Sequence, residues 1–218
     1  NGLCVSPGLV DIRVQIGEPG EEHKESILSA VQSAVSGGIT SLVCLPNTNP
    51  VLDDQATVEF VKRRADSHNM ARVFTYGAAT KGLRGKELAE IGLLSESGAL
   101  AFTDGIKAIS DARIMHKVLS YASTFNLLVV QHPEEESLSN GGVMNTGEMA
   151  TRLGLPGIPR EAEIIMLERD LRLVEMTDSR YHAAHISTSE SVEIITKAKK
   201  KEELTDSQSK VFNDLFGS

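Results

Sequence analysis

Six short apolar segments, each followed by a longer amphipathic segment, constrain the fold of this 218-residue chain more than any other feature. The short segments are typical of buried strands, and the segments between them repeat apolar residues at the 3.6-residue period of a helix. We predict strands at residues 9–16, 41–45, 72–78, 99–102, 127–131 and 181–186, and helices at residues 22–35, 54–68, 86–95, 111–125, 148–153, 160–175 and 190–200. Such an alternation predicts an α/β fold in which right-handed crossovers join parallel strands.

A doubly wound open sheet and a TIM barrel both fit this alternation, and the residues that follow the strands favour the barrel. Polar, chemistry-capable side chains stand at the ends of five predicted strands: Gln15, Asn47, Asp104, His132 and His185. A barrel brings all such ends to one mouth, whereas an open sheet uses a single crevice. We therefore expect a TIM (β/α)8 barrel over residues 1–201, with about six of its strand–helix units evident. Residues 202–218 are polar, and we interpret them as a tail or a joined fragment.

Composition and charge exclude several classes of function. The chain has 22 basic and 30 acidic residues, a net charge of −8, so a nucleic-acid partner is not expected. No GxGxxG or Walker loop is present, which argues against a dinucleotide or phosphate-sugar site. No apolar run reaches the ~18 residues of a membrane span. The two cysteines, Cys4 and Cys44, lie in or beside apolar runs, so we expect buried free thiols and a cytoplasmic location.

Several of these polar residues admit both a functional and a structural interpretation. Imidazole is a common neutral ligand of zinc, but His132 and His185 also fit as core histidines with satisfied hydrogen bonds. Asp104 could hold a metal or act as a base, and it could equally form the Asp-Gly turn with Gly105. Asn47 could bind a substrate carboxylate or simply form a turn. Asp11 lies inside an apolar strand, so we expect it to have a partner.

Nine short motifs, in fixed order from residue 1 to about 200, resemble bacterial dihydroorotases. They are residues 6–11 (SPGLVD), 17–25 (GEPGEEHKE), 37–40 (GGIT), 46–50 (PNTNP), 101–105 (AFTDG), 131–134 (QHPE), 142–145 (GVMN), 153–159 (LGLPGIP) and 184–188 (AHIST). The resemblance implies an amidohydrolase-type (β/α)8 barrel that interconverts N-carbamoyl-aspartate and dihydroorotate in pyrimidine biosynthesis, with one or two zinc ions that activate the attacking water.

The resemblance also assigns roles to individual residues. It places His132 and His185 at metal-ligand positions, Asp104 near the strand-four carboxylate ligand and Asn47 at a substrate-carboxylate contact. The family usually reads Asp-Asp-Gly where this chain has one Asp, so the register of Asp104 stays open. The catalytic Asp of the family lies on the eighth strand, which this chain does not show.

The first strand departs from the family pattern Asp-x-His-x-His-x-Arg. The chain has Arg13 and Gln15 in place of the two histidines and Gly17 in place of the arginine. A guanidinium stays protonated and has no acceptor, so Arg13 cannot ligate zinc. This departure resembles a non-catalytic branch of the family, some members of which are structural partners of aspartate transcarbamoylase.

Two hypotheses follow. In the first, the protein is a dihydroorotase-like pseudoenzyme that binds no metal and acts as a structural partner of aspartate transcarbamoylase. In the second, a reduced site with one zinc ion still hydrolyses cyclic amides, and Arg13 binds the substrate carboxylate. In both we expect a homo-oligomer.

Overall fold

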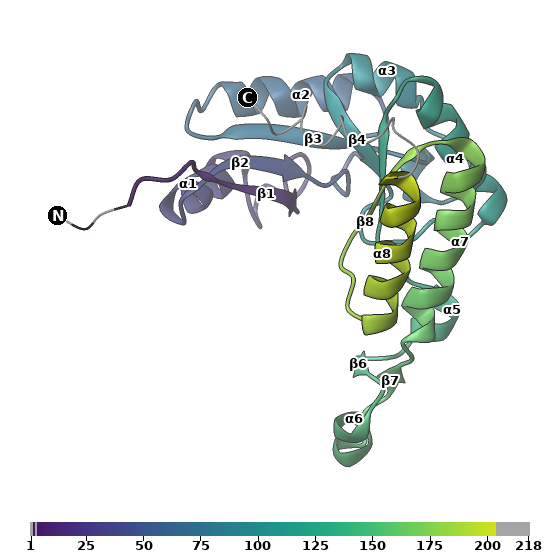
Figure 1. The fold of residues 1–218 in the computed structure, drawn as a ribbon. Helices are drawn as coiled ribbons and strands as arrows, with labels where there is room; N and C mark the ends of the chain where they lie inside the picture. Colours follow the sequence, from purple (N-terminus) through teal and green to yellow (C-terminus); the bar gives the residue numbers. More distant parts are fainter. Residues whose placement is uncertain (1, 3, 204–218) are drawn as a thin grey trace. The chain divides into compact units, whose positions relative to one another are not determined.

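The computed structural model of the protein describes residue 2 and residues 4–203, and its centre is a sheet of six parallel strands (Figure 1). In spatial order the strands are β1 (Leu9–Val14), β2 (Ile39–Cys44), β3 (Arg72–Ala78), β4 (Ala99–Thr103), β5 (Leu128–Gln131) and β8 (Arg180–Ala183). Every neighbouring pair is parallel. The predicted α/β fold with parallel strands is therefore confirmed.

Helices connect the strands, as the sequence periodicity predicts. They are α1 (Ile27–Ser36), α2 (Gln55–Asp66), α3 (Ile91–Glu96), α4 (Ala112–Thr124), α7 (Glu161–Thr177) and α8 (Ser189–Glu203), and a 3-10 turn, η1, spans Lys81–Leu83. Helix α1 begins at Ile27, later than the predicted residue 22. It begins there because Ser26 caps it: the Ser26 hydroxyl accepts a hydrogen bond from the Ser29 amide. Asp54 and Asp111 cap α2 and α4 in the same way. The helix predicted at 86–95 is shorter than expected, and its first residues form a loop.

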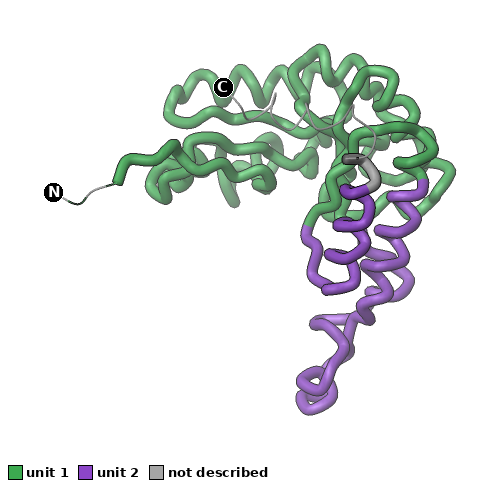
Figure 2. The backbone as a smooth tube through the Cα atoms, in the orientation of Figure 1, with its two compact units in different colours: residues 1–132, 173–184 green, residues 133–172, 185–218 purple. Residues whose placement is uncertain are grey.

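The chain divides into two compact units (Figure 2). The first contains residues 1–132 and 173–184, which include the whole six-stranded sheet. The second contains residues 133–172 and 185–218. Its short elements are α5 (Glu136–Ser139), β6 (Met144–Asn145), α6 (Glu148–Leu153) and β7 (Gly157–Ile158), and β6 pairs with β7 in parallel. Of the segment 202–218, predicted to be a tail, residues 202 and 203 continue α8, and 204–218 lie outside the described residues.

The core of the first unit lies where the helices cover the sheet. Its largest fully buried side chains include those of Phe102, Ile91, Leu94, Met115 and Leu119. Burial at this density, worth about 1.5–3 kcal/mol for each large apolar side chain, holds the strands and so fixes their C-terminal ends. No helix in the described part of the chain is long and apolar enough to cross a membrane.

One expectation about burial is wrong, that of a buried Cys4. Cys4 is exposed, because it precedes β1 rather than belonging to it, and Cys44 is buried as predicted. Burial raises the pKa of the Cys44 thiol to about 12.

Candidate functional site

Arg13 on β1 holds the C-terminal edge of the sheet together. Its Nη2 donates a hydrogen bond to the carbonyl oxygen of Gly105, which follows β4, at 2.9 Å. β1 and β4 are not neighbours in the sheet, because β2 and β3 lie between them. The Nη1 atom of Arg13 is buried and has no hydrogen-bond partner among the described residues. Burial lowers the pKa of this guanidinium, but Arg stays charged at any ordinary pH.

The two residues that precede Arg13 on β1 form hydrogen bonds that hold the strand in place around it. Asp11 accepts a hydrogen bond from the backbone amide of Arg13 at 3.0 Å, which confirms that the strand carboxylate has a partner. The hydroxyl of Tyr76 on β3 donates to the carbonyl oxygen of Ile12 at 2.8 Å. Burial raises the pKa of Tyr76, partly offset by the charge of Arg13, so the phenol stays protonated and keeps donating. Gln15 is exposed at the end of the strand.

Asn47 lies against Gly105 from the loop after β2. The φ angle of Gly105 is +74°, and a Cβ atom there would lie only 1.7 Å from Oδ1 of Asn47. Glycine is required because it tolerates a positive φ and leaves room for the Asn47 amide. Oδ1 of Asn47 is buried without a hydrogen-bond partner among the described residues. An unpaired donor on Arg13 and an unpaired acceptor on Asn47 thus flank the same glycine.

Asp104 is directed at the neighbouring loop after β3. One carboxylate oxygen accepts a hydrogen bond from the Thr80 amide at 2.8 Å, and the other accepts one from the Thr80 hydroxyl. Asp104 is 3% exposed and Thr80 is fully buried. Burial raises the pKa of Asp104, and its hydrogen bonds to Thr80 oppose that rise. Both carboxylate oxygens therefore fix the β3 loop in this structure.

The end of β5, also in the first unit, carries Gln131 and is followed by His132. Gln131 is buried, and its Oε1 accepts a hydrogen bond from the Ile109 amide at 2.8 Å. His132 follows directly and is half-buried. Asn47, Asp104 and His132 thus follow strands of one sheet at its C-terminal edge, as predicted, and Arg13 is the last but one residue of β1.

His185 belongs to the second unit, where Glu163 orders the loop that carries it. His185 is exposed and has φ +58°, in the left-handed region. One oxygen of Glu163 accepts hydrogen bonds from the amide and hydroxyl of Ser187 at 2.9 and 2.7 Å. The other accepts from the amide and hydroxyl of Thr188 at 3.1 and 2.8 Å. Burial raises the pKa of Glu163, but hydrogen bonds outweigh that effect and lower it to about 2.

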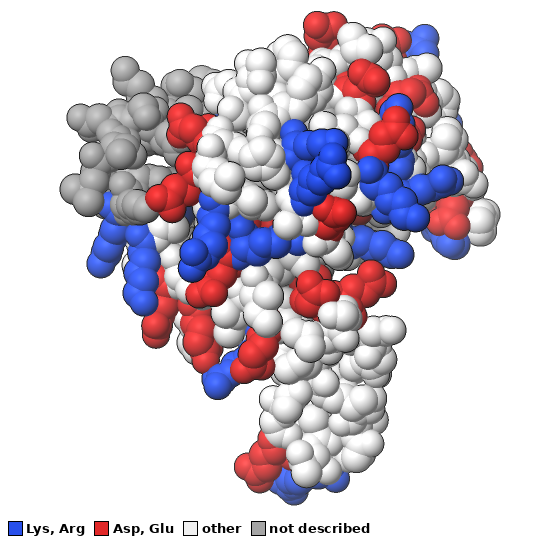
Figure 3. Space-filling view, turned by 90° about the vertical axis from the view of Figure 1, so that its right-hand side faces the viewer, with Lys and Arg blue, Asp and Glu red and all other residues white. Residues whose placement is uncertain are grey.

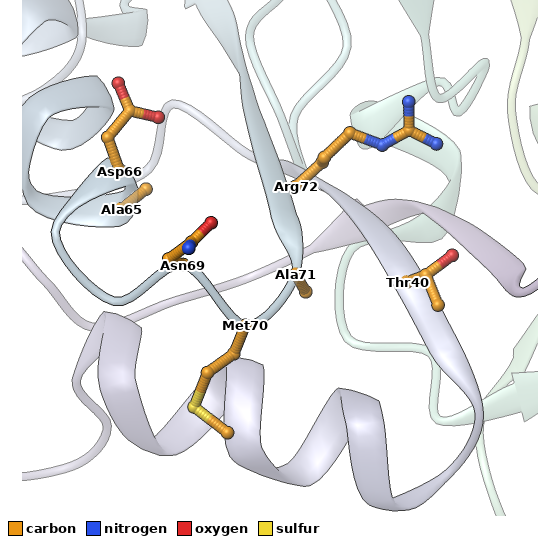
Figure 4. A pocket seen from close by; sticks show the side chains of 7 residues that line it. All are labelled: Thr40, Ala65, Asp66, Asn69, Met70, Ala71 and Arg72. Carbon is orange, nitrogen blue, oxygen red and sulfur yellow. The ribbon is translucent and has the colours of Figure 1, made fainter.

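A polar pocket lies at the other end of the strands (Figure 4). It is lined by Thr40, Ala65, Asp66, Asn69, Met70, Ala71 and Arg72. Thr40 and Arg72 stand at the start of β2 and β3, so the pocket is remote from the C-terminal edge. In barrel folds this amino-terminal end contributes stability rather than chemistry.

The side chains at the C-terminal edge do not fit a zinc centre. Across residue 2 and residues 4–203, no group of three or more His, Cys, Asp or Glu side chains could together hold a metal ion. Asp104 is hydrogen-bonded through both oxygens, and Arg13 adds a positive charge that would repel a dication. The donor set at this edge therefore differs from the three or four nitrogen, sulfur or carboxylate ligands that zinc sites in proteins use.

Sequence reasoning missed three residues that build this geometry. Thr80 follows β3 by two positions, so the strand-end rule that found the other residues would have found it as well. The role of Gly105 depends on a contact 92 residues away, which no local pattern reveals. Glu163 is one acid among several on α7, and nothing in the periodicity distinguishes it.

Curated relatives support the motifs on which the resemblance rests. The chain is 46% identical over 200 residues to a dihydroorotase of Endomicrobium trichonymphae, covering 92% of this chain and 47% of that protein. It is 45% identical over 197 residues to a dihydroorotase of Syntrophobacter fumaroxidans, covering 90% of this chain and 45% of that protein. The chain thus spans about half the length of the curated relatives it matches.

Solved structures share the fold at low sequence identity. The L-hydantoinase (dihydropyrimidinase) of Arthrobacter aurescens matches with a TM-score of 0.70 and 20% identity, over 90% of this chain and 45% of that one. Dihydroorotase of Saccharomyces cerevisiae in complex with 5-fluoroorotic acid matches with a TM-score of 0.64 and 14% identity, over 90% and 52%. The six parallel strands therefore share the α/β barrel-type fold of these structures, as predicted. A family profile described as dihydro-orotase-like matches residues 2–191, and the chain belongs to that family.

Proposed function

We propose that this chain is the barrel portion of a dihydroorotase-like protein of pyrimidine biosynthesis whose catalysis is impaired or absent. In this proposal the protein acts in the cytoplasm as a structural partner of aspartate transcarbamoylase. The single observation that carries it is the Arg13 guanidinium, hydrogen-bonded to Gly105 at the edge where the family's first-strand histidines would bind metal.

Electrostatics supports the proposal. Two unit charges of like sign at 4 Å repel by about 4 kcal/mol at the effective dielectric of a protein surface, and a dication doubles that figure. Asp104 offers no compensation in this geometry, because Thr80 donates to both of its oxygens. Gln15, the other substituted position, carries an amide that binds zinc poorly compared with imidazole.

The alternative is an active cyclic-amide hydrolase with a reduced site that holds one zinc ion. It is favoured by the presence of Asn47 and His132 at strand ends, because a purely structural barrel has no need of them. The substrate would then be dihydroorotate or carbamoyl-aspartate. Under this alternative the His132→Ala variant loses turnover, and turnover unaffected by that change would reject it.

The zinc content of the whole protein, purified without chelator, distinguishes the pseudoenzyme from the active hydrolase. We expect well under one zinc ion per chain after dialysis. About one or two retained ions per chain would overturn the pseudoenzyme proposal. Dihydroorotate hydrolysis, measured on the same preparation, should be absent.

A double variant tests whether ligand loss explains the inactivity. Arg13→His with Gln15→His should raise zinc retention toward one ion per chain. Arg13→Gln with Gln15→Asn, which removes the charge without adding imidazole, should not. If the histidine variant gains neither zinc nor activity, loss of these two ligands is an inadequate account.

Co-elution of the two proteins tests the proposed partner. We expect aspartate transcarbamoylase from the same organism to co-elute with the whole protein and to lose activity or stability when the protein is omitted. Separate elution with unchanged transcarbamoylase stability would contradict the structural role.

A further inference from the structure

The polar pocket at the amino-terminal ends of the strands contains two opposite charges that do not pair with each other. Asp66 is the last residue of α2, and Arg72 is the first residue of β3. Both are exposed, and neither forms an ion pair with any residue of the described ranges, residue 2 and residues 4–203. Figure 4 shows their side chains on two sides of Asn69. Each charge is therefore available to a group from outside the chain.

Asp66 stands at the unfavourable end of its helix. The C-terminus of a helix carries a partial negative charge, so an acid there is repelled and a cation is attracted. Asp66 occupies this position on the twelve-residue helix α2. A bound cation would be stabilised both by the carboxylate and by the helix end. An ammonium group therefore fits this side of the pocket.

The other side of the pocket is built from hydrogen-bond donors. Arg72 contributes a guanidinium, which can bind a carboxylate through two parallel N–H groups. Thr40 on β2 lies beside it, because the next residue, Ser41, is the partner of Arg72 in the parallel pairing of β2 with β3. Asn69 adds an amide that can donate as well. Within the described part of the chain, the side chains of Thr40, Asn69 and Arg72 form no hydrogen bond. A carboxylate therefore fits this side.

The size of the pocket limits the ligand to a small molecule. The cavity measures about 230 Å³, and Met70 and Ala71 add apolar contact between the two charged sides. Elsewhere the surface gives no sign of a charged polymer as a ligand. On the face drawn in Figure 3, acidic and basic side chains are interspersed, whereas a polyanion would require a face of one sign.

We propose that this pocket binds a free α-amino acid as its zwitterion. The ammonium group contacts Asp66 and the C-terminal end of α2. The carboxylate accepts hydrogen bonds from Arg72, Asn69 and Thr40, and a short uncharged side chain contacts Met70. The charged groups are solvent-exposed, so we expect a dissociation constant of roughly 1 mM. Binding at this end of the strands is independent of whether the C-terminal edge is catalytic.

The need for both charges is tested with L-alanine as the probe. Equilibrium dialysis of radiolabelled L-alanine against the whole protein gives the dissociation constant. Propionate is alanine without its ammonium group, and ethylamine is alanine without its carboxylate. In competition each should bind about tenfold more weakly than L-alanine, because each lacks one set of charged hydrogen bonds. If propionate competes as well as L-alanine, the pocket binds simple anions and the zwitterion is rejected.

The two charged walls are tested by neutral substitutions. Asp66→Asn and Arg72→Gln should each weaken L-alanine binding about tenfold. The matched controls are Glu59→Gln and Arg63→Gln, an exposed acid and an exposed base on α2 that do not line the pocket. Both should bind L-alanine as the unmodified protein does. Circular dichroism checks that all four variants are folded. Equal losses in the variants and the controls would mean that general electrostatics, rather than this pocket, attracts the ligand.

The location is tested by hydrogen exchange. L-alanine should slow amide exchange over residues 66–72, because a ligand that bridges Asp66 and Arg72 stabilises the closed turn between α2 and β3. No binding of L-alanine at about 50 mM, or binding without local protection, would overturn the proposal. Because the readouts are alanine binding and local exchange, failure here leaves the zinc and hydrolysis results of the proposed function unaffected.

Discussion

Single polar side chains at the C-terminal edge form hydrogen bonds to backbone atoms of other loops. Asp104 accepts from Thr80, and Arg13 donates to Gly105. These contacts cross 24 and 92 residues of sequence, so each closes a long loop. At the scale of the residue, Asp104 and Arg13 therefore hold separate loops together.

Removal of the Asp104 carboxylate should be costly. Asp104→Ala leaves the Thr80 amide and hydroxyl buried without an acceptor, which costs about 1–3 kcal/mol for each group. Asp104→Asn keeps one acceptor for the amide and should cost clearly less. Urea unfolding of the whole protein measures both. Equal destabilisation by the two variants would mean that the charge, rather than the hydrogen bonds, matters.

The two cysteines should differ in reactivity. The pKa of Cys44 is about 12, so at pH 8 about one thiol in 10⁴ is ionised, and the group is buried as well. Cys4 is exposed. Iodoacetamide at pH 8, followed by peptide mass spectrometry, should label Cys4 and spare Cys44 in the native protein. Denaturant should make both react, and native labelling of Cys44 would contradict its burial.

At the scale of the element, the loop after β8 depends on Glu163. Its pKa of about 2 lies below the ordinary 4.5. The folded state thus favours the carboxylate, and this stabilisation is fully present above pH 4.5 and is lost as the pH falls toward 2. Above that window the loop should stay ordered, because all four donors keep their acceptor.

Glu163→Gln should loosen this loop at neutral pH. The new amide nitrogen is a donor and would face a donor of Ser187 or Thr188, so backbone hydrogen bonds are lost. Amide exchange at Ser187 and Thr188 should speed up about tenfold or more, measured by hydrogen exchange. Glu161→Gln, an exposed neighbour on the same helix, is the control and should change nothing. Unchanged exchange in Glu163→Gln would remove Glu163 from this role.

The elements were largely predictable, and the contacts between them were not. Strands 72–78 and 99–102 and helix 148–153 follow directly from apolar periodicity and flanking glycines. β6 and β7 have two residues each, too few to show a period, and were missed. The positions of Asn47 and Arg13 after or within strands were predictable. Their meeting at Gly105 was not, because it depends on the register and curvature of the whole sheet.

At the scale of the whole molecule, the Arg13 guanidinium rather than a metal ion joins β1 to the loop after β4 at the C-terminal edge of the sheet. Chelation should therefore leave the fold unchanged. We expect EDTA, in large excess over the protein, to shift the melting temperature of the whole protein by less than about 1 °C. A fall of about 5 °C or more would show that a metal stabilises the fold, and would count against the proposed function as well.

The bond between Arg13 and Gly105 also bears on how the protein is made. A cation that is encoded in the polypeptide is present once in every newly synthesised copy, at full occupancy and from the moment of folding. Its supply does not vary with nutrition, and no metallochaperone has to deliver it. Cells starved of zinc and cells rich in zinc should therefore accumulate the same amount of correctly assembled barrel.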